Sequence, residues 1–395
     1  MTRHRHRHRR RQRFAVAALA AALSLAAAAC APDEPEPDDP ADDVGATDDG
    51  ETAEPEPEDD APDEADEPDE AEEADDVTLT LLTHDSFDVS EEVLAAFTQD
   101  TGIDVDVVPS GDAGTALNQA ILTQDAPQGD LLFGVDNTFL SRALDEELFV
   151  PHESPQLDAV PDELILDPEH RATPIDVGDV CLNYDRDWFD DADVDVPSDL
   201  AYLTDPAYEG LLAVTNPATS SPGLAFLLAT IERFGEDDAF EFWEDLAAND
   251  VIVTDGWSEA YYDEFSGAGE GDRPLVVSYA SSPPAEVFFA DPQPDEAPTG
   301  VIEASCFRQI EHVGILDGTE HEAEARQFVD FMLDVPFQED MPLTMFVFPV
   351  NTDAELPEVF REHAVEPDAP LEMDYREIGE HREDWIDEWT SVVLR

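Results

Sequence analysis

Two aromatic residues in the second half of the chain stand at positions that favour ligand contact. Trp257 follows Gly256 in a polar turn, and Tyr279 ends an apolar run that predicts a strand. The face of an aromatic ring attracts a cation within about 6 Å, most strongly when the ring is Trp and the site is dry. These residues therefore predict a site for a cationic or aromatic ligand, although either ring could instead belong to the hydrophobic core.

Carboxylates flank the predicted elements of the first half of the chain. Asp112 lies directly before a helix, where it could balance a cation or accept from an amine; a solvated helix cap is the alternative. Asp85 follows the first predicted strand beside His84. Asp136 closes the third strand, at the carboxyl edge where ligands of open α/β sheets bind. We expect Asp85, Asp112 and Asp136 to contribute to one site.

Ser220 and Ser221 precede Pro222 and the apolar helix GLAFLLATIERF. Hydroxyls and free N–H groups at a helix N-terminus, with proline near the first turn, form a clamp for an anion or a hydroxyl. A simple N-cap is the alternative, and the same residues can serve both roles. Ser281 and Ser282 are expected to add hydroxyls to the same site from the other lobe of a two-lobed fold.

The sequence lacks the common catalytic patterns. It contains no GxSxG, HExxH, P-loop or CxxC segment. We therefore expect a binding protein without a cofactor, with a membrane-anchored hydrolase as the remaining enzymatic alternative.

The chain has 395 residues, of which 98 are acidic and 18 basic, and a formal net charge of −80. This charge excludes a nucleic-acid binder held by phosphate contacts. Residues 77–395 alone carry 73 acids against 11 arginines. Such an excess is typical of halophilic proteins, and its self-repulsion lowers stability at low salt.

The N-terminus has the pattern of an export signal. Residues 1–13 are basic, residues 14–29 form an apolar, Ala-rich run of 16 residues, and Cys30 follows. We expect a signal peptide over 1–29, too short to span a membrane. The small residues before Cys30 resemble a bacterial lipobox, although Ala27 stands where Leu is usual. This predicts a lipoprotein held by acylated Cys30 on the outer face of the cytoplasmic membrane; an ordinary signal peptide is the alternative.

The segment after Cys30 is unsuited to folding. Residues 31–76 hold 25 acids, many Pro and no Leu, Ile, Phe, Tyr or Trp. Without apolar surface to bury, the segment cannot offset the entropy of ordering. We expect residues 30–76 to be a lipidated Cys and a disordered acidic linker, with an acidic tail for metals or partners as the alternative.

Strand and helix patterns alternate through the rest of the chain. Strands are predicted at 77–83, 103–108 and 130–136, with helices beginning after Ser90 and Gly114, which indicates a parallel α/β sheet. The alternation resumes after residue 175. Two such sets predict two α/β lobes with a ligand cleft between them. We expect residues 77–175 and about 308–335 in lobe I, and residues 176–307 and about 336–395 in lobe II.

Seven segments resemble, in order and spacing, those of periplasmic thiamine-binding proteins of ABC importers. They are LLTHDSF (81–87), GDAGTALNQ (111–119), GVDNT (134–138), TNPATSSPGLAFLL (215–228), VIVTDGWSEAYY (251–262), VVSYASSP (276–283) and FVFPVN (346–351). The resemblance implies a periplasmic-binding-protein type II fold with a hinged cleft. It further implies thiamine or its phosphate esters as ligand, and the permease and ATPase of an ABC importer as partners.

The resemblance also assigns roles to individual residues. Trp257 and Tyr279 match aromatic ligand contacts of the family, and Phe346 stands where the family has Trp. His84 stands where the family has Tyr, which weakens a stacking role there. The hydroxyethyl or phosphate end of the ligand is expected at Ser220 and Ser221. The complete expected binding set is Asp85, Asp112, Ala113, Asp136, Ser220, Ser221, Trp257, Tyr279, Ala280, Ser281, Ser282, Pro283 and Phe346.

Cysteines and tyrosines leave two further expectations. Cys181 and Cys306 are the only cysteines of residues 77–395, and paired cysteines are usual in exported proteins, so we expect a disulfide without a role in binding. The adjacent Tyr261 and Tyr262 could instead chelate ferric iron as phenolates, which makes an iron receptor of the same fold the main alternative function.

Overall fold

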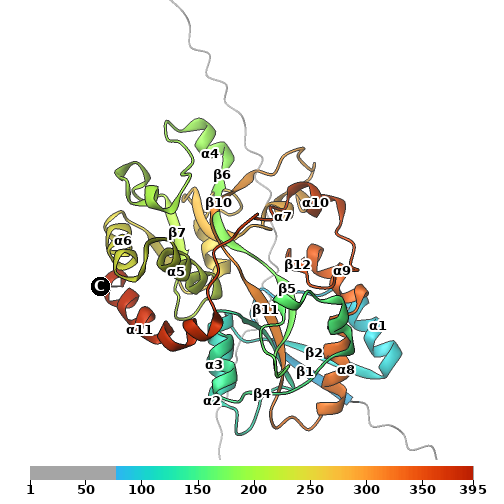
Figure 1. Cartoon of the computed structure of the whole chain (residues 1–395). Helices are drawn as coiled ribbons and strands as arrows, with labels where there is room; N and C mark the ends of the chain where they lie inside the picture. Colours follow the sequence, from blue (N-terminus) through green and yellow to red (C-terminus); the bar gives the residue numbers. More distant parts are fainter. Residues whose placement is uncertain (1–76, 395) are drawn as a thin grey trace, which may run out of the picture. The chain divides into compact units, whose positions relative to one another are not determined.

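The computed structural model describes residues 77–394, so the predicted signal peptide, Cys30 and the linker lie outside the described residues. Within this range the chain forms two mixed β-sheets with helices packed on them (Figure 1). None of the helices in residues 77–394 is both long and apolar enough to cross a membrane.

The first sheet has seven strands in the order β12-β5-β11-β3-β1-β2, with β4 added beside β11. The strands are β1 (Val77–Thr83), β2 (Ile103–Pro109), β3 (Leu131–Asp136), β4 (Phe149–Val150), β5 (Thr173–Val177), β11 (Ile310–Leu316) and β12 (Phe348–Pro349). As predicted, β1 runs parallel to β2 and β3. The expectation of a parallel sheet fails at β11, which is antiparallel to β3 and β5. It enters from the second sheet, so its direction is reversed.

The helices of the first sheet follow the sequence pattern. They are α1 (Glu91–Thr101), α2 (Ala113–Leu122), α3 (Leu140–Asp145), α8 (Glu322–Met332) and α9 (Val335–Thr344), with short 3-10 turns η1 (Pro155–Ala159) and η2 (Asp162–Leu164). α1 stops at Gly102, whose φ of 77° is left-handed and suits glycine. The predicted face of α8, made by Ala325, Phe328, Val329 and Met332, is buried.

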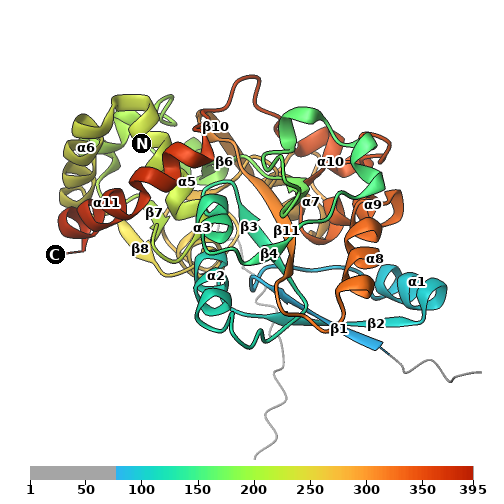
Figure 2. The same ribbon diagram turned by 60° about the horizontal axis from the view of Figure 1, so that its bottom comes forward.

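The second sheet has five strands in the order β10-β6-β9-β7-β8. They are β6 (Val180–Asp185), β7 (Leu212–Thr215), β8 (Ile252–Thr254), β9 (Leu275–Tyr279) and β10 (Thr299–Phe307). The helical segments are α4 (Arg186–Asp191), η3 (Leu200–Thr204), η4 (Pro206–Tyr208), α5 (Ser221–Phe234), α6 (Glu236–Ala248), η5 (Glu259–Glu264), α7 (Pro283–Phe288), α10 (Glu358–His363) and α11 (Tyr375–Val393). α5 packs on the sheet, α6 on α5, and α11 on α6 and α3 (Figure 2).

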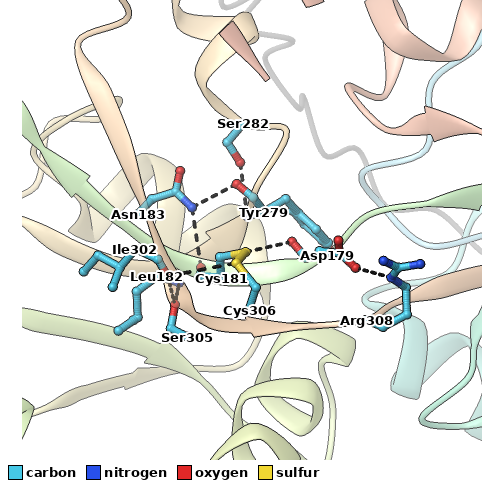
Figure 3. Close-up of a disulfide and its surroundings, with 10 residues drawn as sticks. All are labelled: Asp179, Cys181, Leu182, Asn183, Tyr279, Ser282, Ile302, Ser305, Cys306 and Arg308. Atoms are coloured by element: carbon cyan, nitrogen blue, oxygen red, sulfur yellow. Dashed lines mark hydrogen bonds and ion pairs between the residues drawn. A yellow bond between two sulfur atoms is a disulfide. The ribbon is translucent and has the colours of Figure 1, made fainter. Parts of the chain in front are cut away.

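Two neighbouring crossings connect the sheets. β5 continues into β6 through Gly178 and Asp179, and β10 continues into β11 through Arg308 and Gln309. The amide of Gly178 donates to the carbonyl of Gln309 at 3.1 Å, and Arg308 Nε donates to Asp179 Oδ1 at 2.6 Å. The two crossings are therefore tied to each other, close to the disulfide between β6 and β10 (Figure 3).

Part of the expected lobe II segment joins the first sheet. β12 pairs with β5, and Phe337 and Met341 of α9 pack into the core on that side. A strand of only Phe348 and Pro349 carries no periodic signal that sequence analysis could use. The remainder of the lobe assignment stays a prediction.

Candidate ligand-binding site

A cavity of about 350 Å³ lies between loops of the first sheet and loops of the second. Three loop regions and strand β11 of the first sheet line it, with His84, Asp85, Ser86, Asp88, Asp112, Ala113, Glu311, Thr344, Met345, Phe346 and Val347. The second sheet contributes Ser221, Pro222, Trp257, Ser258, Tyr261, Tyr262, Tyr279, Ser282, Ala285 and Phe289. Most of these loops leave the carboxyl ends of strands, where α/β sheets present ligand-binding groups.

Trp257 is the centre of an aromatic wall. Its ring stacks on Tyr261, with ring centres 4.9 Å apart and planes 19° apart, and lies 6.0 Å from Tyr279. Its indole Nε1 donates to Ser278 Oγ at 2.9 Å. Trp257 and Tyr279 are both half-buried and line the cavity, so neither is an ordinary core residue. The anchored indole presents a fixed face to a ligand.

Asp112 connects the two sides of the cavity. As the N-cap of α2 it accepts from the amide of Ala113 at 2.7 Å, and its second oxygen accepts from the amide of Trp257 at 3.0 Å. Burial raises the pKa of Asp112, against the opposing effect of the Trp257 hydrogen bond. Asp112 therefore caps α2, which was the alternative to a ligand contact, and it also lines the cavity beside Trp257.

The hydroxyls at the start of α5 are split between two environments. Ser221 and Pro222 line the cavity, whereas Ser220 is fully buried outside the lining. The Oγ atom of Ser220 has no hydrogen-bond partner within residues 77–394. Ser221 is therefore the hydroxyl of this pair that faces the cavity, and a hydrogen bond from it also favours the ionised form of the buried Asp136.

Residues 279–283 belong to the same sheet as Ser221, contrary to the expectation that they come from the opposite lobe. Tyr279 and Ser282 line the cavity, and Ser282 Oγ lies 2.9 Å from Ser278 Oγ. The tight turn between β9 and α7 directs neighbouring side chains to opposite sides. Within this segment, the expected contacts that are buried outside the lining are Ala280, Ser281 and Pro283. Ala280 packs instead against the disulfide of Cys181 and Cys306.

Asp136 is buried behind the cavity and is absent from its lining. Its Oδ1 accepts from Thr138 N, Thr138 Oγ1 and Phe139 N, so it closes the turn after β3. The structure thus brings eight of the expected residues to the cavity. They are Asp85, Asp112, Ala113, Ser221, Trp257, Tyr279, Ser282 and Phe346.

Phe346 occupies the rim. Its φ of 55° is left-handed, and its ring lies 6.0 Å from Phe288 and 5.6 Å from Phe289. Since Phe346 follows α9 of the first sheet and the other two rings belong to the α7 region, the three rings meet across the opening.

Glu311 is the most informative residue that the sequence analysis missed. It is a buried acid within the apolar strand β11, it lines the cavity, and its carboxylate lies 3.4 Å from His84 Nε2. Burial is the largest effect on His84 and opposes its protonation, but the charge and hydrogen bond of Glu311, together with the charges of Asp112 and Asp85, outweigh it and raise the pKa of the imidazole. An acid inside the run IEHVGIL was the available signal. Ser258 and Phe289 also line the cavity and were missed, whereas the sequence analysis names Tyr262 only as a possible iron ligand.

Comparisons with known proteins agree with this architecture. The sequence profile described as bacterial extracellular solute-binding protein matches residues 127–375. The chain is 29% identical over 325 residues to the thiamine-binding periplasmic protein of Salmonella typhimurium, covering 80% of this chain and 94% of that protein. It is 24% identical to the protein of the same name from Haemophilus influenzae, covering 74% and 83%.

Solved structures share the fold. A periplasmic thiamin binding protein superposes with a TM-score of 0.71 at 28% identity, covering 80% of this chain and 96% of that chain. Iron-bound HitA from Pseudomonas aeruginosa superposes with a TM-score of 0.64 at 20% identity, covering 80% and 99%, which is a likeness of fold. The fold is the type II periplasmic-binding-protein fold with two mixed α/β sheets. The chain belongs to the family of bacterial extracellular solute-binding proteins, the non-enzymatic receptors of ABC transport.

Proposed function

We propose that this protein captures thiamine or a thiamine phosphate ester in the cavity between the two sheets and delivers it to the permease and ATPase of an ABC importer. The observation that carries this proposal is the contact of Asp112 with Trp257. A carboxylate and an indole held side by side suit a flat cationic ligand, because one balances its charge and the other offers a π face. Similarity to thiamine-binding periplasmic proteins supports the same ligand class.

The two ends of thiamine fit different parts of the cavity in this proposal. The thiazolium and aminopyrimidine rings contact Trp257 and Tyr279, with Asp112 close by. The hydroxyethyl or phosphate end lies at Ser221 and Pro222, where α5 begins and its unpaired amides favour an oxygen-rich group. Phe346 covers the rim in place of the family's Trp.

Mass spectrometry of ligand released from the full-length protein, purified in high salt, tests this proposal. We expect thiamine or one of its phosphates, and calorimetric titration of the stripped protein with each of them identifies the preferred form. A different co-purified solute, together with no heat of thiamine binding, would refute the proposal.

Ferric iron remains the second candidate because Tyr261 and Tyr262 both line the cavity. Iron binding needs phenolates, however, and burial together with Glu286 raises the pKa of both hydroxyls. Tyr261 also donates to Glu286 at 3.2 Å. Metal analysis of protein purified without chelators separates the candidates: stoichiometric iron favours the tyrosines, and metal-free protein that binds thiamine favours the first proposal.

We further propose that acylated Cys30 holds the receptor on the outer face of the cytoplasmic membrane, with residues 31–76 as the tether. The apolar run that ends at Cys30 supports this location. Membrane fractionation of Cys30→Ser is the test. Release of the variant into the soluble fraction is expected, and a variant that stays membrane-bound and is processed like the wild type would overturn the anchor but not export.

A further inference from the structure

Three acids form a row across the first sheet behind the cavity. Glu311 of β11 is paired in register with Asp136 of β3 on one side and with Asp176 of β5 on the other. Directly opposed residues of neighbouring strands project to the same face, and like charges in such pairs repel. The sheet therefore concentrates three carboxyl groups in one line at the wall of the cavity.

No fixed cation of residues 77–394 neutralises this row. Asp136 and Asp176 are fully buried and Glu311 is 5% exposed, yet none of the three forms an ion pair with an arginine. Arg308 pairs with Asp179, and the hydrogen bond of Arg382 goes to Glu383. Both carboxyl oxygens of Asp176 lack a hydrogen-bond donor.

Two of the three carboxyl groups in the row therefore bind protons more readily than a solvent-exposed carboxyl group does. Burial raises the pKa of Asp136 to about 7, and burial with the charge of Glu311 raises the pKa of Asp176 well above its ordinary value. Asp176 and Glu311 are near enough to share a hydrogen bond, which two carboxyls can form only when one of them holds a proton. His84, beside Glu311, adds a further exchangeable proton.

Only part of this system meets the cavity. Glu311 and His84 line it, whereas Asp136 and Asp176 lie behind. A cation above Glu311 stabilises ionised carboxylates in the row, because opposite charges attract. It destabilises protonated His84, because like charges repel. Both changes send a proton to solvent.

We propose that Asp136 and Asp176, connected through Glu311, act with His84 as a proton-exchanging floor of the cavity, so that a cationic ligand bound over Glu311 displaces protons to solvent. This inference rests on the proposed function, because it requires that the ligand carry the positive charge of thiamine. It makes Glu311 a residue that selects for charge, in addition to the aromatic wall that selects for shape.

Other charged groups around the row keep the sign of the effect. Asp112 adds negative charge near His84, and Tyr279 adds a neutral phenol near Glu311 and Asp136. His312, next to Glu311, bonds to the carbonyl of Val135, and burial lowers its pKa to about 4, so it is neutral. Arg382 lies over the ring of Phe139 and its charge acts on Asp136, but it stays a cation with or without ligand and so does not change the sign. Ligand binding is therefore expected to release protons, and affinity is expected to fall as the pH falls.

Calorimetric titration of the full-length protein with thiamine at pH 7, in two buffers of different ionisation enthalpy, measures the proton release. We expect about 0.3 to 1 proton per thiamine, and by linkage an affinity that weakens about two- to tenfold for each pH unit lowered near pH 7. Asp176→Asn removes a shared proton without changing the residues that line the cavity. The number of protons that this variant releases per thiamine is therefore expected to fall by at least half. Asp106→Asn, an exposed acid on β2, is the matched control and should behave like the wild type.

The outcomes separate this inference from the proposed function. Thiamine binding with the same heat in both buffers and no dependence on pH would overturn the proton-exchanging floor and leave the function intact. Release that is unchanged in Asp176→Asn would assign the protons to another group and also overturn it. If Asp176→Asn does not fold, Glu311→Gln is measured in the same way and should lose most of the release. Absence of any thiamine binding would defeat both proposals.

Discussion

Trp257 is the residue whose truncation should reduce affinity most. Its indole is anchored by Ser278 and stacked on Tyr261, so its free face is ready for a cation without further ordering. A desolvated cation over an indole contributes up to about 2 kcal/mol, and each 1.4 kcal/mol is about tenfold in dissociation constant. Trp257→Ala is therefore expected to weaken thiamine at least tenfold in calorimetric titration.

Trp243 supplies the matched control. It is buried in α6, where its ring meets Phe226 and Trp389 and its Nε1 donates to Thr230 at 2.9 Å. Trp243→Ala should lower the free energy of unfolding by about 3 to 5 kcal/mol and spare the affinity of the folded fraction. If a folded Trp257→Ala protein binds thiamine as the wild type does, this tryptophan is no part of the site and the iron alternative gains weight.

Asp112 allows charge to be separated from geometry. Asparagine keeps the shape of the side chain without the charge, but its single carbonyl oxygen can accept from the amide of Ala113 or of Trp257 and not from both, so Asp112→Asn should also lower stability by about 1 to 3 kcal/mol. Loss of the negative charge should weaken thiamine about tenfold, measured by titration beside thermal melting. Equal affinity in Asp112→Asn and wild type, with loss only in Asp112→Ala, would instead assign Asp112 a structural role.

At the residue scale the sequence predicts loops better than side-chain directions. The aromatic and acidic contacts Trp257, Tyr279 and Asp112 reach the cavity because their loops follow or precede recognisable elements. Ser220 and Ser221 are adjacent and chemically identical, but only Ser221 reaches the lining. Which of the two serines faces the cavity depends on the backbone angles at the start of α5, and the residue types there do not specify these angles.

At the scale of elements, local pattern predicts the parallel start of the first sheet but not its antiparallel centre. β11 pairs with β3 and β5 because the chain returns from the second sheet, a contact that spans more than 100 residues. The row of Asp136, Glu311 and Asp176 exists only through this return, so single-strand patterns could not reveal it. Glu311 was visible only as an acid out of place in an apolar strand.

The disulfide offers a prediction at the same scale. Cys181 of β6 and Cys306 of β10 are buried in adjacent strands, and neither lines the cavity. The bond closes a long loop, and bonds of this kind stabilise by about 2 to 4 kcal/mol. The double variant Cys181→Ser/Cys306→Ser should lose about this much in chemical denaturation and keep the thiamine affinity of the wild type. A tenfold loss of affinity in the folded variant would contradict a purely structural role.

At the scale of the whole molecule, three hydrogen bonds within residues 77–394 bridge the two sides of the cavity, in addition to the ring contacts of Phe346. Besides Asp112 and Trp257, the amide of Gly114 donates to the carbonyl of Thr219 at 3.1 Å, and the hydroxyls of Ser86 and Ser258 lie 3.3 Å apart. The core also continues between the two sides, because α11 packs against both α6 and α3. The tied crossings at Asp179 and Arg308 add a further connection between the sheets.

The charge of the molecule leads to a prediction about salt. Residues 77–395 carry 73 acids against 11 arginines, and most arginines that the structure describes are already paired with acids. The remaining repulsion is screened as the Debye length shortens to about 3 Å at 1 M salt. The melting temperature should therefore rise by several degrees between low salt and 1 M NaCl, measured by circular dichroism, and then level off.

Levelling of the melting temperature would identify charge screening as the cause of the stabilisation, because salts that act by exclusion from the protein surface continue to stabilise as their concentration rises. A melting temperature that is flat below 1 M would refute the halophilic interpretation, whereas the ligand proposals would stand, since they rest on the groups that line the cavity.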